Sequence, residues 1–145
     1  MSDVRLGVNN CFAVKRWVEP ERWFAIVKEE LGLDVVQVSL DVVDFDIGPR
    51  HFAVVARRIR RLAEEYGVRL HSVFGGLISY SYNGLMNPNI AYRNARLEWF
   101  TEAIWKAAEL GVDSFGGPLG ALTEKDFLDA KRREYLKEVL IEQLI

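Results

Sequence analysis

One short pattern occurs three times in this chain and constrains its fold more than any other feature. Gly32, Gly67 and Gly111 each follow a glutamate by two residues, precede an apolar residue, and lead into a short run of β-forming side chains. A glycine in this position adopts the left-handed conformation that ends a helix, and the apolar residue after it packs back on the helix. The glycines are 35 and 44 residues apart, which is the length of one strand with its crossover helix and loops. The pattern therefore predicts a series of βα units.

Hydrophobic periodicity and turn signals predict four strands and the helices that connect them. We expect strands at residues 5–9, 35–40, 68–74 and 113–116. We expect helices at residues 20–31, 49–66, 90–110 and 130–145, with a capped turn that Thr123 opens before the last one. The loop after the third predicted strand extends to residue 89 and is rich in aromatic residues, which predicts a lid or a binding wall.

Four βα units in 145 residues are half of an eight-unit barrel, which normally needs roughly 250 residues. We therefore predict an α/β fold in which residues 1–145 form a single half-barrel domain, the (βα)4 half of a TIM barrel, with parallel strands and outer helices. The alternative is a flavodoxin-like doubly wound sheet. That fold typically uses five strands and has a compact phosphate loop after the first.

The last predicted helix reaches residue 145 without the glycine that ends the helices before it, so we expect the chain to be truncated in its fourth helix. A half barrel has an open strand edge on each side of its sheet, and such edges pair readily with other chains. We therefore expect a homo-oligomer or association with a missing C-terminal half.

The charge balance and the cysteine content exclude several classes of function. Lysine and arginine number 19 against 21 acidic residues, and a net charge of -2 provides no positive field for nucleic acid or anionic lipid. The cluster of Arg57, Arg58, Arg60 and Arg61 is interpreted as a solvated helix face. The single cysteine, Cys11, forms no intrachain disulfide and no cysteine pair exists for zinc. Because the N-terminus lacks a signal-peptide pattern and no apolar run approaches roughly 18 residues, we expect a cytoplasmic protein with neither nucleic acid nor membrane as a partner.

In both candidate folds the functional site lies at the C-terminal ends of the parallel strands. Asn9 and Phe12 follow the first strand, and amide and aromatic side chains suit sugar hydroxyls and sugar ring faces. Their alternative role is in a loop that caps its own helix. Asp41, Asp44 and Asp46 follow the second strand, where they either hold a polyol or act as acid and base, or else serve as turn and capping residues.

His71, in the third predicted strand, is the best single candidate for polar chemistry. A histidine near the mouth of a barrel donates to a substrate oxygen or ligates a metal, whereas strand alternation could instead turn it outward under a helix. After the fourth strand, Gly116–Gly120 allows a ligand close to the backbone but lacks the spacing and the lysine of a phosphate loop. Cys11 has no histidine near it in sequence, and Lys15 and Arg16 leave room for a phosphate.

The order of four segments is similar to that of a known family. The segments are Leu6-Gly7-Val8-Asn9, Asp34-Val35-Val36-Gln37-Val38, Leu70-His71-Ser72-Val73-Phe74-Gly75-Gly76 and Ser114-Phe115-Gly116-Gly117-Pro118. Their succession resembles the N-terminal half of the xylose isomerase-like TIM barrels. Within that family the nearest subgroup is the sugar and sugar-phosphate isomerases and epimerases of the D-tagatose 3-epimerase type. The resemblance covers nearly all 145 residues.

The resemblance implies proton transfer next to a carbonyl group, with a divalent metal (Mn, Mg or Co) that polarises the substrate oxygens and two glutamates that shuttle the proton. In the family these groups come from later strands, so this chain is expected to hold no metal and to be inactive alone. Only the substrate-binding wall carries over, and His71 is the one candidate for a catalytic role. The residues of that wall are Asn9, Phe12, Asp41, His71, Phe74 and Gly117.

Apurinic-site endonucleases share this fold and bind zinc through histidines after successive strands. The fourth strand here ends in Phe115-Gly116-Gly117 without a histidine, which argues against a DNA repair enzyme. Two hypotheses follow. The chain is the N-terminal half of a metal-dependent sugar or sugar-phosphate isomerase or epimerase, with a small sugar or sugar phosphate as partner. Alternatively it is a non-catalytic half-barrel fragment or engineered scaffold that self-associates.

Overall fold

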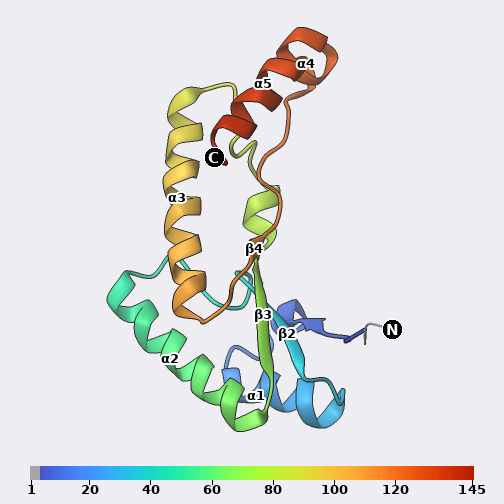
Figure 1. The fold of residues 1–145 in the computed structure, drawn as a ribbon, viewed down its shortest axis with the longest axis vertical. Helices are drawn as coiled ribbons and strands as arrows, with labels where there is room; N and C mark the ends of the chain where they lie inside the picture. The colour runs from blue at the N-terminus through green and yellow to red at the C-terminus, as the bar shows by residue number, and fades with distance from the viewer. Residues whose placement is uncertain (1–3) are drawn as a thin grey trace. The chain divides into compact units, whose positions relative to one another are not determined.

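A computed structural model describes residues 4–145, apart from the side chain of Ile78. Its centre is a four-stranded sheet in which all strands are parallel and follow one another in the order β1-β2-β3-β4 (Figure 1). The strands are β1 (Val8–Asn9), β2 (Val35–Ser39), β3 (Arg69–Phe74) and β4 (Phe115–Gly116). In a flavodoxin-like sheet the first strand lies inside the sheet and the strand order reverses beside it. The consecutive order is that of a barrel, and the predicted half-barrel fold is confirmed.

The helices follow the predicted succession with differences in detail. They are η1 (Asn10–Ala13), α1 (Pro20–Ala25), η2 (Ile26–Glu30), α2 (Pro49–Tyr66), η3 (Leu77–Tyr80), α3 (Ile90–Glu109), α4 (Glu124–Leu128) and α5 (Ala130–Glu142). The first predicted helix continues from α1 into a π-helical turn, η2, and the last helix ends at Glu142. No helix among residues 4–145 is both long and apolar enough to cross a membrane. Residues 1–3, on which the absence of a signal peptide partly rests, lie outside the described residues.

The repeated glycines end their helices as predicted. Gly32, Gly67 and Gly111 have φ angles of 65°, 60° and 78°, all in the left-handed region. At the end of α2 the amide of Gly67 donates to Glu64 and the amide of Val68 donates to Ala63, at 3.1 and 2.8 Å. This pair of hydrogen bonds satisfies the last helical carbonyls and turns the chain directly into β3.

The chain divides into two compact units, each described separately below. The first unit comprises Met1–Gly75 and Ile104–Gly116, and the second comprises Gly76–Ala103 and Gly117–Ile145. The first therefore holds the whole sheet with α1, α2 and the last turns of α3. The interpretation of residues 1–145 as a single half-barrel domain stays a prediction.

The core of the first unit lies on one face of the sheet. Val36 and Val38 of β2 are fully buried, as are Trp23 of α1 and Phe52 of α2. Between Val36 and Val38, Gln37 is only partly buried, because successive side chains of a strand point to opposite faces. The second face of the sheet is thus the more polar and the more exposed one.

A buried lysine holds the loop after β2. Lys106, 5% exposed, extends from the end of α3, and its Nζ donates to the carbonyl oxygens of Phe45 and Ile47. The same ammonium group lies 5.7 Å from the centre of the Phe52 ring. The loop that leads from β2 to α2 is therefore tied to the core by charge-assisted hydrogen bonds.

In the second unit, two loops come into close contact at Gly84 and Gly120, which form an antiparallel bridge. The amide of Leu85 donates to Leu119 at 2.9 Å, and the amide of Ala121 donates to Asn83 at 3.1 Å. A methyl group on Gly84 would collide with the carbonyl oxygen of Leu119, and Gly84 also has a φ of 54°. This contact requires glycine and fixes the loop that follows η3.

A second local prediction is confirmed in the same unit. Thr123 caps α4 by accepting a hydrogen bond from the amide of Asp126 at 3.1 Å, and its hydroxyl donates to the Asp126 carboxylate at 2.6 Å. Arg132 donates to the same carboxylate at 3.1 Å. The capping hydroxyl and the guanidinium both favour the ionised carboxylate, and they hold the pKa of Asp126 below its usual value.

Candidate functional site

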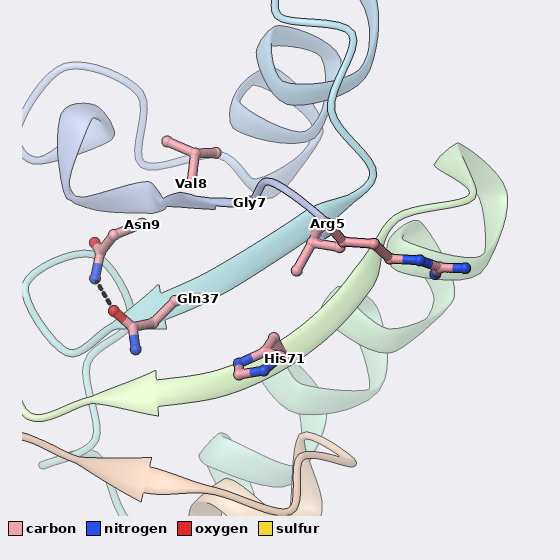
Figure 2. A pocket seen from close by; sticks show the side chains of 7 residues that line it. Arg5, Gly7, Val8, Asn9, Gln37 and His71 are labelled. Carbon is pink, nitrogen blue, oxygen red and sulfur yellow. Dashed lines mark hydrogen bonds between the residues drawn. The ribbon is translucent and has the colours of Figure 1, made fainter. Parts of the chain in front are cut away.

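The exposed face of the sheet carries a hollow of about 280 Å³ that crosses β1, β2 and β3 (Figure 2). The residues that line it are Arg5, Gly7, Val8, Asn9, Val35, Gln37 and His71. Most of the side chains with polar groups come from three neighbouring strands, where parallel pairing brings them side by side. Amide and imidazole groups at the base of an open hollow suit a hydroxyl-rich ligand.

A chain of hydrogen bonds connects the polar side chains across the three strands. The amide nitrogen of Asn9 donates to the Gln37 carbonyl oxygen at 2.8 Å, as Figure 2 shows. The Gln37 amide nitrogen donates in turn to the Ser72 hydroxyl at 3.0 Å. Ser72 Oγ lies 3.0 Å from Nδ1 of His71. The first two donors point the same way along the chain, toward β3, so that each bond polarises the next one.

The position of His71 depends on an irregularity in the pairing of β2 with β3. Val36 pairs with Leu70 but the next residue, Gln37, pairs with Ser72, so that His71 has no partner opposite it. A bulge of this kind places two successive side chains on one side of the sheet and changes the direction of the bulged one. His71 is consequently exposed in the hollow, and the alternative of a histidine turned outward under a helix is wrong.

The other candidate residues lie in different places. Phe12 lies in η1 after β1, where its ring packs edge-on against Trp17 with 6.4 Å between ring centres, and it does not line the hollow. Asp41 follows β2 and accepts a hydrogen bond of 2.9 Å from the Ser39 hydroxyl. Phe74 is the last residue of β3 and pairs in register with Ser39. The structure therefore brings Asn9 and His71 together in the hollow and leaves Phe12, Asp41 and Phe74 at the strand ends.

Gly117 follows β4 in the chain and belongs to the second unit. Its φ of 143° is one that glycine adopts far more readily than other residues. This backbone conformation accounts for a glycine at the position without any ligand. A role for Gly117 in the substrate-binding wall stays a prediction.

Gln37 lines the hollow but is absent from the sequence-based candidates, whereas Asn10, which follows the first predicted strand beside Asn9, does not line it. Gln37 is the central link of the hydrogen-bond chain, and its signal in the sequence is a single amide inside the apolar run Val35–Val38. Asn10 is fully buried, and its Oδ1 accepts a hydrogen bond of 2.7 Å from the Ser39 amide, which ties the end of β1 to the end of β2. No sequence signal distinguishes Asn10 from Asn9, because only the three-dimensional fold buries Asn10 fully and leaves Asn9 half-buried.

Comparison with known proteins supports the same fold and shows how much of each related protein this chain covers. No protein-family model matches the sequence. A solved structure from Rhodospirillum rubrum, provisionally named a xylose isomerase, is 33% identical, with a TM-score of 0.91 over 99% of this chain and 48% of its own. A D-psicose 3-epimerase crystallised in the presence of D-fructose is 17% identical, with a TM-score of 0.67 over 97% of this chain and 46% of its own, which shows the fold alone.

One curated relative is an epimerase. The D-erythrulose 1-phosphate 3-epimerase of Brucella abortus is 26% identical over 137 residues, which are 94% of this chain and 44% of the relative. The chain thus spans about half the length of the proteins it matches. The predicted resemblance to xylose isomerase-like barrels and sugar epimerases is confirmed.

Proposed function

We propose that this chain is the N-terminal half of a metal-dependent isomerase or epimerase of sugars or sugar phosphates, and that its sheet supplies the wall against which the substrate binds. The observation that carries the proposal is the hydrogen-bond chain from Asn9 through Gln37 and Ser72 to His71, in a hollow on the exposed face of the sheet. In a complete barrel this face would be the interior. The similarity to sugar epimerases supports the choice of substrate class.

The hydrogen-bond chain gives His71 a specific task. Ser72 accepts from Gln37, and its own hydroxyl hydrogen is then available to Nδ1 of His71. If Ser72 donates, the neutral imidazole carries its proton on Nε2. That N–H is the group we assign to a hydroxyl or carbonyl oxygen of the substrate, so His71 binds and orients the sugar rather than transferring a proton.

The residues of this chain do not fit the divalent metal of the family by themselves. Among residues 4–145 no three side chains of His, Cys, Asp or Glu come together in a way that would hold a metal ion. In the proposed complete enzyme the metal ligands and the proton-shuttling glutamates belong to a C-terminal half, and this chain alone binds sugar without converting it.

The proposal is tested by NMR titration of the ¹⁵N-labelled chain with free ketoses, D-fructose and D-tagatose. We expect shifts confined to resonances of Asn9, Gln37, His71 and their strand neighbours. His71→Ala should abolish them, whereas His51→Ala, which removes an exposed histidine of α2, should leave them unchanged. Absence of any shift in the wild-type chain, or equal shifts in the two variants, would refute the proposed binding wall.

A second function has one observation in its favour. β1 is an edge strand of the sheet, and the side chain of Leu6, two residues before it in the chain, is 73% exposed. An exposed strand edge with apolar flanks favours self-association, as a scaffold without catalysis requires. Light scattering of the purified chain decides this point, since a monomer at all concentrations excludes the scaffold and a stable dimer supports it.

A further inference from the structure

The second unit contains a hollow of its own, of about 310 Å³, between the loop after η3 and the first turns of α3. Its lining residues are Ser81, Tyr82, Asn83, Gly84, Asn87, Tyr92 and Arg96. The bridge between Gly84 and Gly120 fixes one wall, and Asn83 reinforces it by donating to the carbonyl of Ala121 at 2.8 Å. This hollow shares no residue with the one on the sheet.

Arg96 lines the hollow, and a second arginine, Arg93, lies one turn earlier on the same face of α3. The Arg96 guanidinium lies 5.1 Å from the Tyr82 ring centre and 4.9 Å from that of Trp99. Arg93, three residues earlier and only 8% exposed, donates to the carbonyl oxygen of Asn87 at 2.7 Å. Within residues 4–145 neither guanidinium forms an ion pair with a carboxylate. A buried charge without a counter-charge is costly, so the buried Arg93 favours a bound anion, and the half-buried Arg96 offers that anion a second cation.

The walls of the hollow suit the organic part of such an anion. Tyr82 and Tyr92 line the hollow and are 54% and 67% exposed. Asn87 accepts from the amide of Asn89 at 2.9 Å, which fixes the orientation of its side chain and leaves its amide nitrogen to donate. Exposed aromatic rings and amide donors are the groups that contact the C–H faces and hydroxyls of a polyol.

We propose that this hollow binds the phosphate group of a phosphorylated sugar or polyol, with Arg96 as its direct ligand and Arg93 as the buried charge behind it. A phosphate monoester carries close to two negative charges at neutral pH, which matches two guanidinium groups better than a single carboxylate does. The planar fork of Arg96, already held between Tyr82 and Trp99, can donate two parallel N–H groups to phosphate oxygens. The proposal stands on residues other than those of the proposed function and does not depend on it.

Binding is measured by NMR titration of the ¹⁵N-labelled chain with glycerol phosphate, inorganic phosphate and glycerol. We expect glycerol phosphate to shift the resonances of Tyr82, Asn87, Tyr92 and Arg96 at concentrations where glycerol does not. Arg96→Met should weaken binding at least about tenfold, the loss typical of a charge-assisted bidentate contact, and Arg96→Lys should give an intermediate loss. Arg50→Met, which removes an exposed arginine of the first unit, serves as the matched control.

Tyr92→Ala is the variant that tests the site without risk to folding, because this side chain is largely exposed. We expect it to weaken glycerol phosphate but not inorganic phosphate, since inorganic phosphate has no polyol to contact the ring. The proposal is overturned if Arg96→Met binds glycerol phosphate as tightly as the wild-type chain, or if glycerol binds as well as its phosphate.

Ketose 1-phosphate, added as a fourth ligand, distinguishes the source of the phosphate. Shifts at Arg96 with ketose 1-phosphate, at concentrations where the free ketose gives none, would identify a sugar phosphate as a ligand of this hollow, whereas shifts with glycerol phosphate alone would identify another phosphate ester. Both outcomes support the hollow as a phosphate site. Binding of free ketose at His71 without binding of glycerol phosphate would leave the proposed function intact and refute this inference, and the reverse result would do the opposite.

Discussion

Asn9 at the end of β1 donates a hydrogen bond of 2.8 Å to Gln37 in the middle of β2, and this contact sets the direction of the polar chain that ends at His71. The two residues are 28 positions apart in sequence and become neighbours only through the parallel pairing of their strands. Because Gln37 uses its carbonyl oxygen for Asn9, its amide nitrogen is directed to Ser72. The orientation of the Gln37 amide thus determines that Ser72 accepts a hydrogen bond from it.

Replacement of Gln37 by leucine removes both links at once. Asn9 and Ser72 each lose one hydrogen bond, and we expect the free energy of unfolding to fall by about 1 kcal/mol, since this face is open and water replaces part of the loss. We also expect ketose binding to be lost, because the His71 ring is no longer held in one orientation. Urea denaturation and the ketose titration measure the two effects. Asn94→Leu, on an exposed position of α3, is the control for introducing an apolar side chain.

The tautomer of His71 is a direct consequence of the same chain. We expect neutral His71 to carry its proton on Nε2, because Ser72 accepts from Gln37 and its own hydroxyl hydrogen is then available to Nδ1, 3.0 Å away. Long-range ¹H–¹⁵N spectra of the two histidines report the protonated nitrogen. Ser72→Ala should produce a mixture of tautomers at His71 and leave His51 unaffected. A wild-type His71 protonated on Nδ1 would contradict this, and would show that the Ser72 oxygen accepts from both Gln37 and His71.

Gly84→Ala should destabilise the second unit. The left-handed conformation alone costs an alanine about 1–2 kcal/mol, and its methyl group would collide with the carbonyl oxygen of Leu119. Hydrogen exchange locates the effect, and we expect the amides of Leu85 and Ala121 to lose protection. Gly116→Ala is the matched control, because nothing lies within 4 Å of the added methyl group there. Equal protection in both variants would contradict a tight contact at Gly84.

The ionised carboxylate of Asp126 should make stability depend on pH. Hydrogen bonds from Thr123 and Arg132 lower the pKa of Asp126 in the folded chain below that of the unfolded chain. The stabilisation is therefore complete above the unfolded pKa and is lost as the pH falls through the folded pKa. Melting temperatures measured from neutral to acidic pH should show this loss for the wild-type chain. Asp126→Asn should be less stable at neutral pH and should approach the wild-type chain in acid.

Much of this fold is readable from the sequence because its signals are local. The glycines at 32, 67 and 111 end their helices through their own backbone conformation, and the caps at Thr123 act within one turn. The four predicted strands are present, although β1 and β4 are shorter than predicted because each pairs on one side only and over two residues. The candidates Asn9 and His71 follow from their places on these strands.

The tertiary structure alone decides how the site is put together. Alternation along one strand leaves the direction of His71 open, because the bulge opposite Gln37 is a property of the pairing between β2 and β3. Similarly, the fate of the neighbouring amides Asn9 and Asn10, one in the hollow and one buried against Ser39, depends on how the end of β1 meets β2. Local conformational preferences determined the order and the ends of the elements in this chain. Contacts between residues far apart in sequence determined which side chains share a hollow, because register and bulges are set by both strands of a pair together.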